Sequence, residues 1–201
     1  HQPSPWINDY GQFSIMPIRG RDKVDEESRQ SWFSHQSEEA RPYYYSVYLA
    51  DHDIRVEITP TERAAMMRFT FPDSKESGVV IDAFDRGSYI RVMHDKRTVV
   101  GYTTRNSGGV PDNFKNWFIV RFDRKIRDFQ IYDGTKPVEG EQLVGEHALV
   151  RVGFETRRGE QVTVRAASSF ISQMQAVQNL EELGKDDFET VKAKAQAHWD
   201  E

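Results

Sequence analysis

Apolar and polar residues alternate with a period of two along most of the chain between about residue 43 and residue 170. Such a period places successive side chains on opposite faces of a strand, so one face can enter a core while the other faces water. Short turn sequences such as Asp51-His52-Asp53 and Arg158-Gly159 separate the runs. The clearest runs lie at residues 54–59, 66–71, 118–122, 150–154 and 162–166. Many short strands joined by short turns predict an all-β fold, a large antiparallel β-sandwich.

Two segments interrupt this pattern. Residues 19–30 are charged and irregular, which predicts a surface loop. Asn106-Ser107-Gly108-Gly109 is rich in glycine, and a glycine-rich turn can cradle a phosphate when a helix follows it. No helical pattern follows here, so we interpret this segment as the loop of a β-hairpin.

The pattern becomes helical at Ser172. Ser172 and Gln175 have the spacing of a capping box, and Gly184 is placed to end the helix that the box begins. A second box, Asp186 with Glu189, predicts a second helix. The stripes expected to be buried are Met174, Val177, Leu180 and Leu183, then Phe188, Val191, Ala195 and Trp199. We therefore predict a β-sandwich domain over residues 1–171 and a helical segment over residues 172–201, which either docks on the sandwich or begins a linker to a missing domain.

Composition limits the classes of function. With 201 residues the chain is long enough for one large domain with a sizeable core. It has no cysteine, which excludes disulfides and thiolate chemistry. A formal net charge of -5 disfavours nucleic-acid binding, which needs a basic face. No apolar run approaches the ~18 residues needed to span a membrane. The aromatic content of 12% suits both an ordinary sandwich core and the stacking of sugar rings.

The usual catalytic and metal-binding motifs are absent from the sequence. His35 and Glu38 are three residues apart, a spacing that can join a metal site on a helix, but they fall in a polar stretch that we expect to be a loop. A glycosidase needs two carboxylates roughly 5 to 9.5 Å apart. Asp9, Asp82 and Asp85 lie near predicted strands or turns, and nothing in the local sequence selects a catalytic pair among them.

The N-terminal segment HQPSPWINDYGQF combines stiffness with sugar-contacting chemistry. Two prolines restrict its backbone, which would hold His1, Gln2 and Trp6 in a fixed relation. An imidazole, an amide and an indole ring can offer hydrogen bonds and a stacking plane to a sugar. The residues alone leave two interpretations open, a sugar subsite or a rigid loop with a buried tryptophan.

Four segments stand out together in their order along the chain. They are HQPSPWINDYGQFSIMP, WFSHQSEEARPYYYSVYL, VEITPTERAAMMRFTFP and SSFISQMQAVQNLEEL. Taken in this order, they resemble the N-terminal domain of glycoside hydrolase family 92, the calcium-dependent α-mannosidases. The sequence departs from the family at Tyr43, where glycine is usual, and at Met66 and Met67, where an aromatic-histidine pair is usual. The resemblance therefore does not imply identical specificity.

The resemblance implies a front domain of the β-supersandwich type followed by an α/α toroid. In the family, the toroid carries the general acid, the general base and most calcium ligands, and no stretch of this sequence matches those motifs. We therefore expect no catalytic residue and no metal ligand within the chain. The first strands of the front domain are also expected to be missing. His1, Gln2, Trp6 and His35 are the expected sugar contacts.

The implied function is that of the N-terminal domain of an exported, inverting exo-α-1,2-mannosidase acting on α-mannoside glycans. The C-terminal helix would lead into the catalytic domain. The alternatives are a stand-alone carbohydrate-binding module and a structural domain without a ligand. A front domain separated from its catalytic partner would expose apolar surface, so we also expect self-association through the C-terminal helix.

Overall fold

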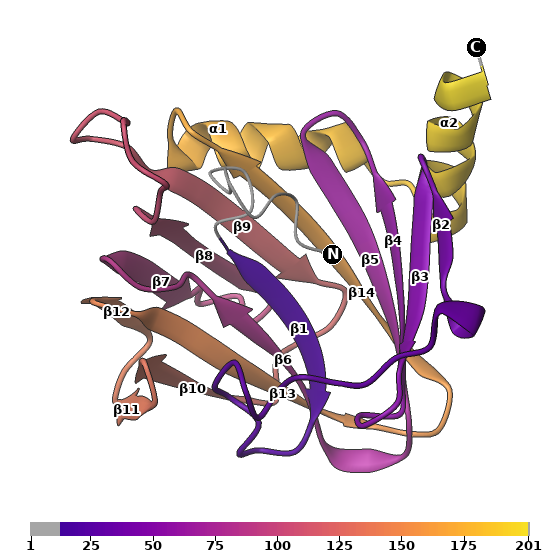
Figure 1. Cartoon of the computed structure of the whole chain (residues 1–201), viewed down its shortest axis with the longest axis horizontal. Helices are drawn as coiled ribbons and strands as arrows, with labels where there is room; N and C mark the ends of the chain where they lie inside the picture. The colour runs from indigo at the N-terminus through magenta and orange to yellow at the C-terminus, as the bar shows by residue number, and fades with distance from the viewer. Residues whose placement is uncertain (1–12, 201) are drawn as a thin grey trace.

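The computed structural model describes residues 13–200, and within them fourteen strands form two antiparallel sheets (Figure 1). The smaller sheet has the order β1-β6-β13-β10-β11, and the larger has the order β12-β7-β8-β9-β14-β5-β4-β3-β2. The smaller sheet consists of β1 (Ser14–Arg19), β6 (Ser74–Asp82), β10 (Asp128–Asp133), β11 (Lys136–Val138) and β13 (Ala148–Thr156). The larger consists of β2 (Glu39–Arg41), β3 (Tyr44–Leu49), β4 (Ile54–Pro60), β5 (Ala64–Phe71), β7 (Ser88–Val92), β8 (Thr98–Thr103), β9 (Asn116–Phe122), β12 (Gln142–Gly145) and β14 (Glu160–Ser169). The predicted all-β, antiparallel sandwich is confirmed.

The space between the two sheets holds the main hydrophobic core. Inward positions of both sheets supply it, including Ile54, Phe69, Phe118, Val150 and Val164, all of which are buried. Burial of one such side chain contributes roughly 1.5–3 kcal/mol. The period-two runs therefore identified the core-facing side of each strand correctly.

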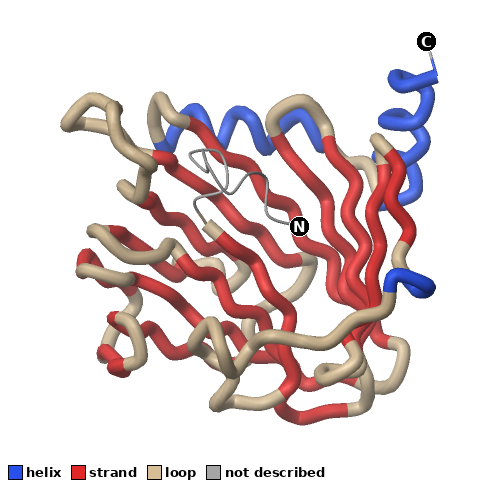
Figure 2. The backbone as a smooth tube through the Cα atoms, viewed as in Figure 1, coloured by secondary structure: helices blue, strands red, loops and turns tan. Residues whose placement is uncertain are grey.

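Two helices follow β14 and pack on the outer face of the larger sheet. They are α1 (Gln173–Leu180) and α2 (Phe188–Asp200), drawn in blue in Figure 2. A second hydrophobic cluster joins Met66 and Ile119 of the sheet to Leu180 and Phe188 of the helices. The expectation that this face of the strands meets water is wrong here, because the helices exclude water from Met66 and Ile119. The helical segment docks on the sandwich.

Helix α1 begins where the sequence predicts and buries most of the predicted stripe, with Met174 as the exception. Ser172 caps it, since its hydroxyl accepts a hydrogen bond from the Gln175 amide at 3.0 Å. The Gln175 side chain donates to Asn179 rather than returning to the cap, so only half of the capping box forms. Met174, which was expected in the buried stripe, is exposed, whereas Ala176 is buried. The small alanine lets the helix approach the sheet closely.

Helix α2 starts one residue later than the predicted box. The Asp187 carboxylate accepts a hydrogen bond from the Thr190 amide at 2.9 Å, which makes Asp187 the capping residue. The predicted pair of Asp186 with Glu189 is wrong, because Glu189 instead lies 2.7 Å from the Arg68 guanidinium on β5.

The turn between the two helices ends as predicted, but the tip of α2 is exposed rather than buried. The turn η2 (Glu181–Leu183) ends at Gly184, whose positive φ of 51° confirms its predicted terminating role. Phe188 and Val191 are buried against the sheet, whereas Trp199 is 61% exposed. The apolar face of α2 is therefore covered only in its first half.

No helix within residues 13–200 is long and apolar enough to cross a bilayer.

The charged segment at residues 19–30 is a loop, as predicted, but part of it is buried. Val24 and Arg29 are both 6% exposed, so the expectation of a purely surface loop is wrong. The Arg29 guanidinium donates to the Val24 carbonyl and to the Asp82 carboxylate of β6. The predicted turn at Asp51-His52-Asp53 is confirmed. His52 is buried there, and its Nε2 lies 3.0 Å from the Arg29 carbonyl oxygen.

Candidate functional site

Three loops meet at the end of the sandwich where β6 ends and β1 begins. They cover residues 83–87, 104–115 and 146–147, and together they are called the loop cluster below. Ser14 of β1 pairs with Asp82 of β6 at this end. The Thr104 hydroxyl donates to the Gly87 carbonyl at 2.6 Å, and the Gly87 amide donates to the Glu146 carbonyl at 3.0 Å. These bonds join the three loops to one another.

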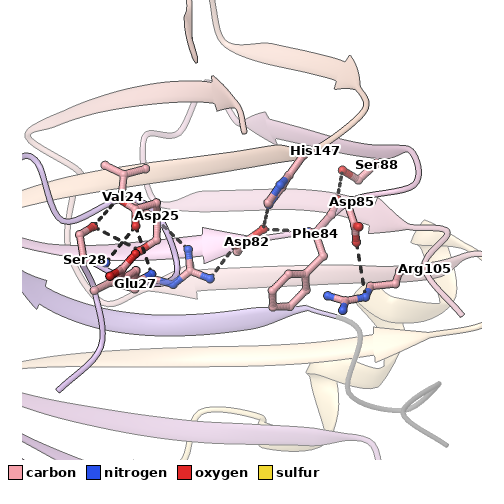
Figure 3. A network of polar contacts seen from close by, with 11 residues as sticks. Val24, Asp25, Glu27, Ser28, Asp82, Phe84, Asp85, Ser88, Arg105 and His147 are labelled. Atoms are coloured by element: carbon pink, nitrogen blue, oxygen red, sulfur yellow. Dashed lines mark hydrogen bonds and ion pairs between the residues drawn. The ribbon is translucent and has the colours of Figure 1, made fainter. Parts of the chain in front are cut away.

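The buried carboxylate of Asp82 fixes the loop cluster to the sheets (Figure 3). Its Oδ2 accepts a hydrogen bond from Arg29 at 2.6 Å, and its Oδ1 lies 2.8 Å from both His147 Nε2 and the Phe84 amide nitrogen. Burial alone would raise the pKa of Asp82, but the His147 hydrogen bond and the Arg29 charge outweigh it and lower that pKa. The same hydrogen bond raises the pKa of His147, although burial opposes it. Asp82 is therefore an ionised structural centre.

Phe84 is held in a backbone conformation that is rare for a bulky residue. Its φ of 56° lies in the left-handed region, which is strained for side chains of this size. Asp82 accepts its amide hydrogen, and the Ser88 hydroxyl donates to its carbonyl at 2.8 Å. The Arg105 guanidinium carbon lies 4.8 Å from the ring centroid, and the His147 ring lies 6.3 Å away. These contacts fix an aromatic ring within the loop cluster.

A polar hollow of about 290 Å³ lies in the loop cluster. Its lining includes Arg86, Thr104, Asn106, Asp112 and Phe114. The Arg86 guanidinium donates to the Asn106 carbonyl at 3.0 Å, which links two of the loops across the hollow. A mixture of guanidinium, hydroxyl, amide and aromatic groups is suited to a ligand that carries many hydroxyls.

The carboxylates singled out from the sequence do not form a catalytic pair here. The Asp82 side chain is fully buried and has its oxygens occupied by three partners. Asp85 lies 3.4 Å from Arg105 in an ion pair, and Asp9 lies outside the described residues. The acid and the base of a glycosidase must both reach the reacting sugar. Asp82 and Asp85 therefore hold neighbouring groups in place rather than act as an acid–base pair.

Comparison with known proteins identifies the family. A family profile described as the glycosyl hydrolase family 92 N-terminal domain matches residues 1–169. The chain belongs to glycoside hydrolase family 92. A family 92 inverting mannosidase from Bacteroides thetaiotaomicron is 39% identical over 99% of this family 92 chain, with a TM-score of 0.90. A family 92 α-mannosidase from the same organism is 30% identical over 94% of the chain, with a TM-score of 0.87.

The family 92 chain spans only 27% and 28% of the lengths of those two enzymes. Another family 92 glycosyl hydrolase is 21% identical over 94% of the chain and 28% of its own length, and it shares the fold with a TM-score of 0.79. Among curated proteins, none is similar enough to count as a match. The resemblance carried by the four sequence segments is confirmed.

Three of the predicted sugar contacts of the family 92 domain precede the described fold. His1, Gln2 and Trp6 lie outside the described residues. The segment that carries them joins the described fold at Phe13, whose ring stacks on Phe118 with centroids 4.6 Å apart. Because Phe13 directly precedes β1, this junction lies at the end of the sandwich that carries the loop cluster. The sugar contacts themselves stay a prediction.

The fourth predicted contact, His35, is not brought to the loop cluster. It lies in the short helix η1 (His35–Ser37) before β2, which is the edge strand opposite β12 in the larger sheet. Its Nδ1 lies 2.6 Å from the Glu38 carboxylate, which also accepts a hydrogen bond from the Tyr45 hydroxyl. The His35 side chain is exposed. Its role as a sugar contact stays a prediction.

The described residues do not fit a complete calcium site. Within residues 13–200, no three histidine, aspartate or glutamate side chains gather closely enough to hold a metal ion. Calcium takes roughly six to eight oxygen ligands, several of them commonly carboxylates.

Sequence reasoning missed Arg29 and His147 as members of the loop-cluster network. The available signal was Asp82, a charged residue directly after the apolar run at residues 79–81. A charge at such a position needs partners, because an isolated buried charge is costly. The two partners lie 53 and 65 positions away along the chain, so no local pattern could name them.

Proposed function

We propose that this chain is the N-terminal domain of an exported, calcium-dependent, inverting exo-α-1,2-mannosidase. The observation that carries the proposal is the match of almost the whole chain to part of an inverting family 92 mannosidase. In this proposal a second domain outside the chain, an α/α toroid, supplies the general acid, the general base and the calcium ligands. The substrates are α-mannoside glycans, and export brings the enzyme to them.

In this proposal the loop cluster shapes one side of the sugar pocket where the two domains meet. The fixed Phe84 ring and the polar hollow beside Arg86 and Asn106 support the assignment. The junction at Phe13 supports it too, because it attaches the segment with His1, Gln2 and Trp6 at the same end of the sandwich. A preformed, polar pocket wall lowers the cost of orienting a sugar for reaction.

The proposal also assigns residues 172–201 to the connection with the second domain. A groove of about 510 Å³ runs between the second half of α2 and the strands beside it. Its lining includes Pro42, Pro60, Val191, Ala195 and Trp199. An apolar groove with an exposed tryptophan is a suitable surface for a packed neighbouring domain.

The direct test is mannose release from α-1,2-mannobiose in the presence of calcium, followed by sugar chromatography. We expect no release by this 201-residue chain, folded as checked by circular dichroism, and release by the full-length gene product. Release by the chain alone above a mock-purified control would contradict the placement of the acid and base. The sequence-derived alternative, a stand-alone sugar-binding module, predicts binding without hydrolysis even by the full-length product.

A variant series in the full-length product tests the loop cluster separately. We expect Phe84→Ala and Arg105→Ala to lower kcat/KM by about tenfold or more, because a misplaced sugar reacts slowly. Trp32→Ala is the matched control, since Trp32 is an exposed aromatic residue outside the loop cluster. If all three variants keep the kcat/KM and the thermal stability of the unsubstituted enzyme, the loop cluster does not form part of the pocket.

A further inference from the structure

A row of three aromatic rings crosses the outer face of the larger sheet. Tyr89 on β7 pairs with Tyr102 on β8, and Tyr102 pairs with Trp117 on β9. The ring centroids lie 5.5 Å apart in the first pair and 4.7 Å apart in the second. All three side chains are half-buried, and they point away from the main core because their neighbours Ile90 and Phe118 point into it. Residues in cross-strand register on one face form a continuous strip.

A groove of about 600 Å³ is lined by Tyr89 and Trp117 of this row but not by Tyr102, and α1 forms another part of its lining. Along β9, the outward positions run from Trp117 through Ile119 to Arg121. Along β7, they run from Tyr89 to Arg91. One end of the groove is therefore aromatic, and the other carries hydrogen-bonding groups. The lining at that polar end includes Arg91, His94, Asp95, Thr98 and Arg121.

The α1 side of the groove is held in place by a hydrogen bond to the sheet. The Gln173 side chain lines the groove, and its Nε2 donates to the Phe118 carbonyl at 3.1 Å. This bond fixes Gln173 as part of the groove wall on β9.

We propose that this groove binds a glycan chain, at a site separate from the loop cluster. The C–H faces of sugar rings stack on Tyr89 and Trp117, and hydroxyls bond to the groups at the polar end. Aromatic rings at one end and guanidinium, hydroxyl and imidazole groups at the other give a sugar both a face to stack on and partners for its hydroxyls.

The proposal goes beyond the pocket-shaping function, because the groove and the hollow of the loop cluster share no lining residue. The groove lies on the sheet face, and the hollow lies among the loops. One part of a glycan chain can therefore occupy the groove while another part of the same chain reaches the sugar pocket. A second contact of this kind raises the local concentration of the polymer near the first.

Titration calorimetry of the 201-residue chain tests the groove, with α-linked mannotetraose and cellotetraose as the probes. We expect saturable binding of at least one tetrasaccharide. Tyr89→Ala and Arg91→Ala should each weaken it about three- to tenfold, the loss typical of one stacking or hydrogen-bonding contact. Tyr48→Ala, which removes an exposed tyrosine on β3 of the same sheet, should leave the affinity unchanged. Trp117 is a poorer target, because it also packs against the second hydrophobic cluster.

Phe84→Ala separates this site from the loop cluster. Binding in the groove should survive that change, whereas binding in the loop cluster should not. Absence of binding to both tetrasaccharides by the folded chain would overturn the proposal. So would binding that Tyr89→Ala and Arg91→Ala leave intact. Self-association that Tyr89→Ala abolishes, without any sugar binding, would make the groove a protein interface and also overturn it.

Discussion

The Nε2 atom of His147 lies 2.8 Å from Oδ1 of Asp82, and this contact joins the start of β13 to the end of β6 across 65 positions of sequence. Asp82 also accepts a hydrogen bond from Arg29, so one carboxylate ties a long loop and two strands together. The loop cluster is built on this tie. Its strength therefore determines how rigidly the polar hollow and the Phe84 ring are held.

The His147–Asp82 contact makes the stability of the fold depend on pH. Folding raises the pKa of His147 above its usual 6.5, so its stabilising contribution is full below that value and is lost as pH rises through the folded pKa. We expect His147→Gln to lower the Tm more at about pH 5.5 than at about pH 8.5. The stabilising contribution of Asp82, whose pKa is lowered, is lost only as pH falls below the usual carboxyl value of 3.8, so it does not affect this comparison. Thermal unfolding by circular dichroism gives both Tm differences, and a loss that grows with pH would contradict the assignment.

Removal of the Asp82 charge should destabilise the whole domain. Asp82→Asn leaves the Arg29 guanidinium, whose side chain is only 7% exposed, without a counter-charge. A broken buried pair costs about 3–5 kcal/mol, and urea denaturation measures the loss. Glu155→Gln is the control, because Glu155 and Arg127 form an exposed pair whose loss should cost about 0.5 kcal/mol or less. Equal losses in the two variants would show that Asp82 is not the structural centre described above.

Gly101 should tolerate no side chain. A Cβ atom at this position would lie 2.2 Å from the Tyr89 carbonyl oxygen and 2.6 Å from the Phe118 ring. We expect Gly101→Ala to cost at least about 1–3 kcal/mol through overpacking, measured by urea denaturation. Displacement of Phe118 would also disturb its stacking on Phe13, visible as shifted aromatic proton resonances. Gly108→Ala is a useful contrast, because Gly108 has a φ of 106° but open space around it, so only backbone strain applies there.

The exposed half of α2 should drive self-association of the isolated chain. Trp199 is 61% exposed beside the apolar groove that Val191 and Ala195 help to line. Sedimentation velocity over a concentration series should show dimers or larger species that Trp199→Ser reduces. Trp32→Ser is the control, since Trp32 is similarly exposed at a different site. A chain that stays monomeric at every concentration would contradict this expectation.

The sequence predicted the sandwich because alternation is a local property that survives in almost every strand. It predicted the helical side of the second cluster, but not the sheet side, although Met66 and Ile119 are apolar residues at outward positions. Alternation shows that the two faces differ but not what covers each of them. At the start of α1, Met174 was expected to be buried and Ala176 was not, because a methionine resembles a core residue more than an alanine does. These errors concern packing between elements that lie far apart in sequence.

The loop-cluster network was beyond local reasoning, because Arg29 and His147 become partners of Asp82 only through the sheet topology. The family was recognisable because four segments in the correct order carry more information than any single residue pattern. The Tyr89, Tyr102 and Trp117 row was also invisible in the sequence, since its members are neighbours only across strands. Register, rather than composition, creates that surface.

The second hydrophobic cluster sets where the chain can be cut. A shortened chain that stopped at residue 171 would keep every described strand but would strip α1 and α2 from the sheet and bare Met66 and Ile119 to solvent. Such a truncated product should aggregate, form inclusion bodies and be degraded quickly by proteases. The smallest piece worth expressing therefore extends past the last buried residue of α2, Val191, even though the repeated β pattern already ends with β14.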